Sequence, residues 1–254
     1  MLVLILLAFI AIAGALAWYL LSHDHGPKEP ILALWFAFGM GAIGALIAYF
    51  LETKLLAPGS LTAASSKESL LSTTMVVAAI EESCKFIPLA LILYGKSFFN
   101  EHTDGIIYFA LAGLGFGIPE NIIYTIQGGS QTGMTRVFLT SVFHACTTAV
   151  VGYFLAKQKV EHKSPFIVVI AFVGIVLLHG IYDFGLLANN TVLSIVSVTI
   201  TLCLTGALFF LFARATDRDQ DLGLSIVGNN SFCRSCGSPN PHHNLYCAQC
   251  GKNA

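Results

Sequence analysis

The sequence predicts an all-α polytopic membrane protein with about seven transmembrane helices, followed by a small zinc ribbon with four cysteine ligands. Two observations predict the membrane part: 56% of the 254 residues are hydrophobic and only 11% are charged, whereas soluble chains carry roughly 25% charged residues. The mean hydropathy is +0.76. The ribbon is predicted because four of the seven cysteines gather close to the C-terminus.

Seven stretches are apolar over the roughly 20 residues that a helix needs to cross a bilayer. In chain order they cover residues 1–21, 30–51, 70–93, 105–126, 136–156, 166–188 and 191–213. The first stretch has no positively charged segment before it and no small-residue cleavage pattern after it. We therefore expect a helix there and not a signal peptide, and we assign residues 1–213 to a multi-pass membrane domain.

The lysines and arginines of the loops predict the orientation of this domain, because basic loop residues favour the cytoplasmic side. The N-terminus is then outside and the C-terminus cytoplasmic. This orientation places Lys54, Lys67 and Arg136 outside, and it places in the cytoplasm Lys28, Lys96, Lys157, Lys159, Lys163, Arg214 and Arg218. We expect an integral protein of the cytoplasmic membrane, in contact with the lipid bilayer.

The tail contains a soluble linker, predicted over 214–231, and a ribbon, predicted over 232–254. The segment 233-CRSCGSPNPHHNLYCAQCG-251 repeats the pattern C-x2-C-G. Such paired thiols suit tetrahedral zinc, the alternative being two disulfides in an oxidising compartment. The metal ligands would be Cys233, Cys236, Cys247 and Cys250. Because four sulfur ligands close the site, this zinc is expected to be structural, and a cytoplasmic protein is the expected partner of the ribbon.

A few ionisable residues interrupt the apolar spans. They are Glu81, Glu82, Lys85, Glu120, His144, His179 and Asp183. A charge at the centre of a membrane helix costs about 2.5–3.5 kcal/mol on insertion scales, so such residues usually face the bundle interior and are candidates for function. The formal net charge of -1 gives no indication of nucleic-acid binding.

The spacing of these residues adds detail. Lys85 lies three and four positions after the two glutamates, so all three share one helix face, and His179 and Asp183 are also four apart. Their depth in the membrane can be estimated by counting residues from the predicted ends of the spans. By this count the ionisable residues lie at overlapping depths, between the midplane of the bilayer and its outer interface. An ion pair that fixes helix register is the structural alternative for the first group, although a second glutamate is superfluous for that purpose.

The fourth span contains 113-GLGFGIPENIIY-124, whose glycines allow close helix packing. Pro119 cannot donate a backbone hydrogen bond, so we expect a kink next to Glu120. The segment does not match a nucleotide-binding loop, because the spacing G-x-G-x-x-G and the preceding strand are absent.

Four motifs in succession resemble the PrsW family of intramembrane proteases, which is distantly related to the CaaX-processing and bacteriocin-processing membrane proteases. They are E-E-x-x-K (Glu81, Glu82, Lys85), F-x-x-x-E-N (Phe116, Glu120, Asn121), the histidine His144, and H-x-x-x-D (His179, Asp183). Asp104-Gly105 and Arg136 are also similar to the family. The resemblance covers about 75–185 and does not extend to the cysteine tail.

The resemblance implies an endopeptidase that cuts a membrane-anchored protein, such as an anti-sigma factor, near the extracytoplasmic side. Amide hydrolysis needs an activated water, a stabilised oxyanion and a proton donor. We expect Glu81 or Glu82 to be the general base, with Lys85 as their counter-charge. His144 and His179, the latter oriented by Asp183, would stabilise the oxyanion or hold a metal.

Three questions remain open from the sequence. Two histidines and carboxylates suit a catalytic zinc, yet the pattern H-E-x-x-H is absent, so a catalytic metal is neither required nor excluded, and Glu120 could orient water or complete a ligand set. A proton- or cation-coupled transporter is an alternative, although no second half mirrors the fourth span. A membrane scaffold or receptor that presents the zinc ribbon is another.

Overall fold

The computed structural model describes residues 2–56 and 66–224, and these two ranges form helices and contain no strand. The helices are α1 (Leu2–Ser22), α2 (Ile31–Leu55), α3 (Lys67–Leu93), α4 (His102–Val160), α5 (Phe166–Leu187) and α6 (Thr191–Asp221). The predicted all-α fold is confirmed for this part of the chain. The four cysteines of the predicted zinc ribbon lie outside the described residues.

The long helix α4 is two helices joined at a break. Gly129 has φ 79° and ψ −178°, a backbone conformation that glycine adopts readily because it has no Cβ. The break divides α4 into a first arm (102–128) and a second arm (130–160). The spans predicted over 105–126 and 136–156 are therefore extended in the structure, because helix continues up to the break on both sides. The first arm also keeps helical backbone angles through Pro119, where a kink was expected.

Within residues 2–56 and 66–224, six stretches of helix are long and apolar enough to cross a membrane: one each in α1, α2, α5 and α6, and two in α4. They support a multi-pass integral membrane protein. The predicted span over 70–93 corresponds to α3, which is not among them. Glu81, Glu82 and Lys85 interrupt its apolar run, so its length and composition alone do not mark it as a span.

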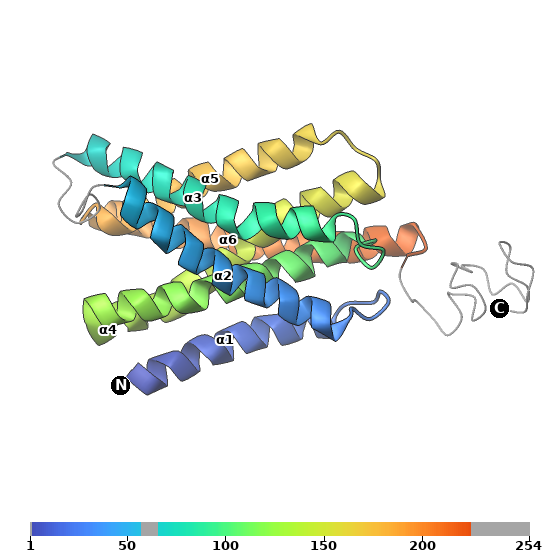
Figure 1. Cartoon of the computed structure of the whole chain (residues 1–254), viewed down its shortest axis with the longest axis horizontal. Coiled ribbons are helices and arrows are strands. Elements are labelled where there is room, and N and C mark those ends of the chain that lie inside the picture. The colour runs from blue at the N-terminus through green and yellow to red at the C-terminus, as the bar shows by residue number, and fades with distance from the viewer. Residues whose placement is uncertain (1, 57–65, 225–254) are drawn as a thin grey trace, which may run out of the picture.

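The helices form an antiparallel bundle around α4, which contacts all five other helices. Figure 1 shows α1 along one side of the bundle, α3 and α5 together on the opposite side, and α2 crossing between them. The N-terminus and the end of α6 lie at opposite ends of the bundle. We call the end that holds the break at Gly129 the turn end, and the end where α4 begins the start end.

Glycines allow the two arms of α4 to pack closely. A Cβ atom at Gly113 would clash with the backbone of His144, and a Cβ atom at Gly105 would clash with the backbone of Gly152. Such close backbone approach is typical of membrane helices that pack through small residues. The contact at Gly113 brings the second arm, and with it His144, next to the segment that carries Glu120.

At the start end, α6 caps the first turn of α4. Asp219 accepts hydrogen bonds from the backbone N–H groups of His102 (2.9 Å) and Thr103 (3.0 Å), and it also accepts one from the His102 ring (2.6 Å). A carboxylate at a helix N-terminus satisfies N–H groups that have no partner within the helix. The soluble linker predicted from residue 214 therefore begins later, because α6 continues to Asp221 and Asp219 is buried against α4.

Candidate active site

The structure brings the seven ionisable residues of the spans together in one place. We call this group the polar cluster: Glu81, Glu82 and Lys85 from α3, Glu120 and His144 from the two arms of α4, and His179 and Asp183 from α5. The three residues of α3 and both histidines are buried, and the other two carboxylates are partly exposed. Helices far apart in sequence thus share one buried polar site.

Lys85 is the centre of the polar cluster. Its Nζ atom donates hydrogen bonds to Glu82 Oε1 (2.8 Å) and to His144 Nδ1 (2.9 Å). The same atom lies 3.6 Å from Glu81 Oε2 and 4.4 Å from the centre of the Phe116 ring, a cation–π distance. The predicted role of Lys85 as counter-charge of the glutamates thus has a geometric basis, and the lysine also contacts a histidine of another helix.

The contacts of His144 define which ring nitrogen carries the proton. A lysine ammonium can only donate, so Nδ1 of His144 accepts from Lys85. The proton of the neutral ring is then on Nε2, which donates to Glu120 Oε2. Both nitrogens of His144 are therefore engaged by other side chains.

Arg136 holds Glu120 from the second arm of α4. Its Nη2 donates to Glu120 Oε1 and its Nε donates to Asn121 Oδ1 at 2.9 Å. The guanidinium lies 4.0 Å from the centre of the Tyr124 ring. The side chains of Arg136 and Glu120 are each 14% exposed. A planar guanidinium can bridge two acceptors in this way, so Glu120 is fixed between Arg136 and His144.

His179 is oriented mainly by Glu82. Its Nδ1 donates to Glu82 Oε1 at 2.7 Å, whereas its Nε2 lies 3.4 Å from Asp183 Oδ2 and 3.6 Å from Glu81 Oε2. The predicted neighbour Asp183 thus contacts the Nε2 side of the ring, while the shortest contact of His179 is with Glu82. Helical spacing indicates that Asp183 is near His179, but the carboxylate from α3 approaches more closely.

The two neighbouring glutamates have different surroundings. Glu82 Oε1 accepts from both Lys85 and His179. Glu81 has no hydrogen bond to Lys85 or His179, only the two 3.6 Å contacts of its Oε2, and this buried oxygen lacks a hydrogen-bond partner. Buried polar atoms without partners are rare, and each one calls for an explanation such as a catalytic role.

Aromatic side chains enclose the polar cluster. Phe143 stacks on Tyr182 with ring centres 3.9 Å apart and meets the His179 ring edge-on at 5.0 Å. Phe116 packs 5.3 Å from the ring of His144. These rings join the second arm of α4 to α5 and surround the charges with apolar groups. Electrostatic interactions within such an enclosed site are stronger than in water.

Glu52 belongs to the surroundings of the polar cluster and was not predicted. The span over 30–51 was expected to end just before it, but α2 continues to Leu55. The carboxyl group of Glu52 lies near Glu120 and Asp183, and its buried Oε1 has no hydrogen-bond partner. A glutamate at the end of an apolar run resembles an interfacial charge, so the sequence carries no signal for this position.

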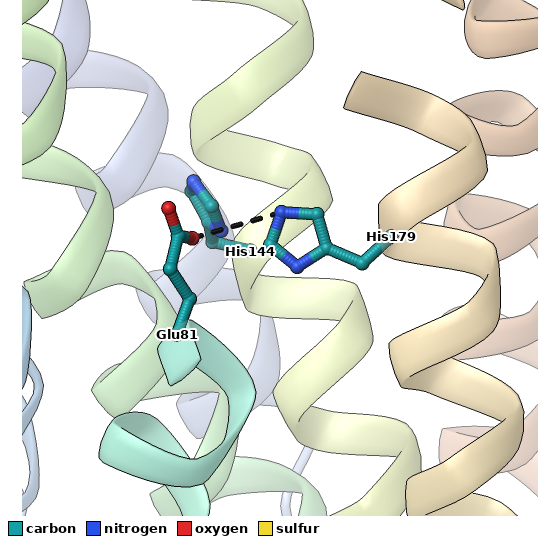
Figure 2. A group of neighbouring side chains, drawn as sticks. All are labelled: Glu81, His144 and His179. Atoms are coloured by element: carbon teal, nitrogen blue, oxygen red, sulfur yellow. Dashed lines mark ion pairs between the residues drawn. The ribbon is translucent and has the colours of Figure 1, made fainter. Parts of the chain in front are cut away.

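Three members of the polar cluster could together hold a metal ion. One ligand atom from each of Glu81, His144 and His179 lies within 4.8 Å of the other two. Figure 2 shows these side chains pointing toward one another from α3, the second arm of α4 and α5. A carboxylate and two imidazoles are ligand types that zinc accepts.

Comparisons with known proteins identify the family of the chain. The family described as PrsW family intramembrane metalloprotease matches residues 29–213, a range that contains the whole polar cluster and ends before the cysteine tail. Protease PrsW of Bacillus subtilis (strain 168) is 32% identical over 190 residues, covering 72% of this chain and 83% of that protein. Protease PrsW of Geobacillus kaustophilus (strain HTA426) is 30% identical over 184 residues, covering 72% and 80%.

A third relative, Protease PrsW of Oceanobacillus iheyensis, is 31% identical over 183 residues, covering 71% of this chain and 81% of that protein. No solved structure shows significant similarity to the chain. The family match spans most of the chain, and the relatives are matched over most of their own length. The chain therefore belongs to the PrsW family of intramembrane metalloproteases and is a membrane-embedded protease.

Proposed function

We propose that the polar cluster is the active site of this intramembrane protease and that Glu81 is its general base. The difference between the two neighbouring glutamates carries the assignment. Glu82 also has a buried Oε2 without a hydrogen-bond partner, but its carboxylate is stabilised by two donors, because Lys85 and His179 both donate to its Oε1. Glu81 Oε2 is free of such bonds, so it is available to accept a proton from water.

Hydrolysis then proceeds in two steps. Glu81 takes a proton from a water molecule while the water oxygen bonds to the carbonyl carbon, and the negative charge moves to the carbonyl oxygen. The C–N bond then breaks as the amine nitrogen receives this proton, which leaves a carboxylic acid and an amine. His179 Nε2, 3.6 Å from Glu81 Oε2, is placed to pass the proton on to the leaving nitrogen.

The remaining charged residues act as positioning residues. Lys85 keeps Glu82 in its ionised form and holds Nδ1 of His144. Glu120, itself fixed by Arg136, holds the opposite side of the same ring. A histidine held at both nitrogens keeps one orientation, which reduces the reorganisation that the reaction requires.

The family description implies a metal ion, and the fit of the polar cluster to such an ion is incomplete. Both ring nitrogens of His144 are engaged, and its Nδ1 is engaged by the Lys85 ammonium. A divalent ion about 4 Å from an ammonium would be repelled by roughly 8 kcal/mol at an effective dielectric constant near 20. We therefore assign the reaction to side chains and water, and no step to a metal.

The substrate is a membrane-anchored protein such as an anti-sigma factor, cut near the extracytoplasmic side of the cytoplasmic membrane. This proposal takes α3 as a seventh transmembrane helix, with the N-terminus outside and the start end of the bundle facing the cytoplasm. Glu120 supports the outer location, since it lies about 13 Å along the first arm from Gly129 and about 27 Å from His102.

For the cysteine tail we propose a cytoplasmic zinc ribbon with a structural zinc held by its four thiolates. The support is the repeated C-x2-C-G pattern of the sequence. With four sulfur ligands this zinc has no open position for catalysis, so the ribbon would bind a cytoplasmic protein partner or regulate the membrane domain. The linker that joins the two parts would begin after Asp221.

Paired substitutions of the two glutamates test the active-site proposal. Glu81→Gln should reduce cleavage of a co-expressed membrane-anchored anti-sigma factor by about 10²–10⁴-fold, the usual contribution of a general base. Glu82→Gln keeps an oxygen that can accept from Lys85 and His179, so we expect a smaller loss. The variants are expressed in bacterial cells that lack a Protease PrsW of their own. Mass spectrometry of labelled N-termini identifies the cleavage products.

The matched control is Glu68→Gln, which alters an exposed glutamate in the first turn of the same helix and should leave cleavage unchanged. Immunoblots of membrane fractions verify that all variants are equally abundant. Full cleavage by the Glu81→Gln variant, or a greater loss for Glu82→Gln, would contradict the assignment of the base.

A further inference from the structure

Lys85 contacts two of the three residues that could together hold a metal ion, His144 and Glu81. Its ammonium is 2.9 Å from His144 Nδ1, 2.8 Å from Glu82 Oε1 and 3.6 Å from Glu81 Oε2. All three atoms are of the kind that coordinates zinc. The side chain of Lys85 is 0% exposed, so it lies entirely within the site and not at its rim.

The hydrogen bonds of the neighbours leave too few free ligands for an ion. His144 gives Nδ1 to Lys85 and Nε2 to Glu120, and Glu82 gives Oε1 to Lys85 and His179. Glu82 Oε2 has no hydrogen-bond partner, but Glu82 does not belong to the group whose ligand atoms lie within 4.8 Å of one another, which is Glu81, His144 and His179. Within this group the atoms left are Glu81 Oε2 and His179 Nε2. Catalytic zinc sites use three protein ligands, so the set is one ligand short while Lys85 keeps its place.

We propose that the ammonium of Lys85 is the resident cation of this active site and excludes a catalytic metal ion. It supplies a positive charge between the carboxylates and His144, in a protein whose family description leads one to expect a metal. Peptide-bond hydrolysis then relies on water and on side chains, with Glu81 as the base and His179 as the group that passes the proton on. The inference rests on the proposed function in one respect, that catalysis takes place at the polar cluster.

Metal content, measured without any reference to activity, tests the inference. The full-length wild type, His179→Ala and Glu81→Gln are purified in detergent, and zinc per chain is counted by elemental mass spectrometry. We expect equal zinc content in the three proteins, and the loss of one equivalent in Cys236→Ser, which removes a ligand of the predicted ribbon. A wild type that holds one equivalent more than His179→Ala or Glu81→Gln would overturn the inference.

Lys85→Met provides the converse test, because methionine is similar in length and carries no charge. It frees Nδ1 of His144, and we expect this variant to bind one additional equivalent of zinc that is lost again in the double variant with His179→Ala. Lys85→Arg keeps the charge and should bind no more zinc than the wild type. Zinc uptake by Lys85→Arg equal to that of Lys85→Met would show that the charge does not exclude the ion.

Cleavage assays separate this inference from the proposed function. The Cys236→Ser variant should cleave substrate at an unchanged rate after exhaustive chelation, and a tenfold or greater loss that added zinc restores would overturn the inference. Unchanged cleavage by both Glu81→Gln and His179→Ala would instead contradict the proposed active site, whatever the zinc count shows.

Discussion

Lys85 and His144 are joined by a hydrogen bond of 2.9 Å although 59 positions separate them in the sequence. It connects α3 to the second arm of α4. From His144 the contacts continue through Glu120 to Arg136. The imidazole ring thus lies between a positive group, Lys85, and a negative group, Glu120, and Glu120 is in turn paired with the positive Arg136. Each member of this chain of contacts limits the orientation of the next, and this makes the effects of substitutions predictable.

Removal of the Glu120 carboxylate should release the ring of His144. We expect Glu120→Ala to lower the cleavage rate by about 10–100-fold, the usual effect of losing the partner that orients a histidine at a metal or catalytic site. Glu120→Gln should cost less, because its carbonyl oxygen still accepts from Nε2 of His144. The rates are measured with purified protein at saturating substrate. An alanine variant as active as the wild type would contradict this role.

Arg136 and Glu120 should behave as one unit in a double-mutant cycle. Arg136→Met leaves a partly buried carboxylate without its cation and should destabilise the protein by about 1–3 kcal/mol. In the background of Glu120→Ala the same change should cost much less, because the carboxylate is already gone. Thermal unfolding in detergent provides the four stabilities.

The control for this cycle is Lys67→Met, which removes an exposed cation near the turn end of the bundle and should have the same small effect with or without Glu120. Additive effects of Arg136→Met and Glu120→Ala would show that the two residues act independently.

The sequence predicted the members of the polar cluster because a charge in an apolar helix is costly and rarely accidental. It also predicted the close packing at Gly113. It did not predict which helix each side chain would meet. The i,i+4 spacing led to Asp183 as the partner of His179, but a carboxylate of α3 is closer, since spacing along one helix carries no information on its neighbours.

The unequal surroundings of Glu81 and Glu82 could not be predicted either. The two residues are adjacent and chemically identical, so only the packing of α5 and the second arm of α4 against α3 distinguishes them. A kink was expected next to Pro119, but the non-helical backbone of α4 lies at Gly129, between the spans predicted over 105–126 and 136–156. A proline within a membrane helix is tolerated when neighbouring helices support the backbone, whereas the positive φ at Gly129 ends the first arm.

A methyl group at Gly113 should disturb both packing and catalysis. Gly113→Ala places a Cβ against the backbone of His144, so the second arm of α4 has to move. Overpacking of this kind costs about 1–3 kcal/mol, and we expect a matching fall in the melting temperature together with reduced cleavage. Gly39→Ala in α2 is the matched control, because a Cβ there meets no atom within 4 Å. Equal melting temperatures for the two variants would contradict the close contact.

Glu101, at the start end just before α4, should make stability depend on pH. Burial and the nearby carboxylates of Asp219, Asp24 and Glu29 raise the pKa of Glu101 to about 9. Between its ordinary pKa of 4.5 and 9, the unfolded chain releases this proton while the folded chain keeps it. The free energy of unfolding should therefore fall as pH rises through this range, by at most about 1.4 kcal/mol per unit.

Glu101→Gln should remove this dependence. At pH 4 the carboxyl group of Glu101 is protonated in both the folded and the unfolded chain. The variant and the wild type should therefore have the same melting temperature. At pH 8 the wild type retains the cost of holding a proton that the unfolded chain has lost, and the variant should melt at a higher temperature. The gap should widen steadily as pH rises toward 9. Asp24, whose pKa burial also raises, keeps a weaker dependence of the same sign in both proteins. A constant gap at every pH would mean that Glu101 is ionised in the folded protein.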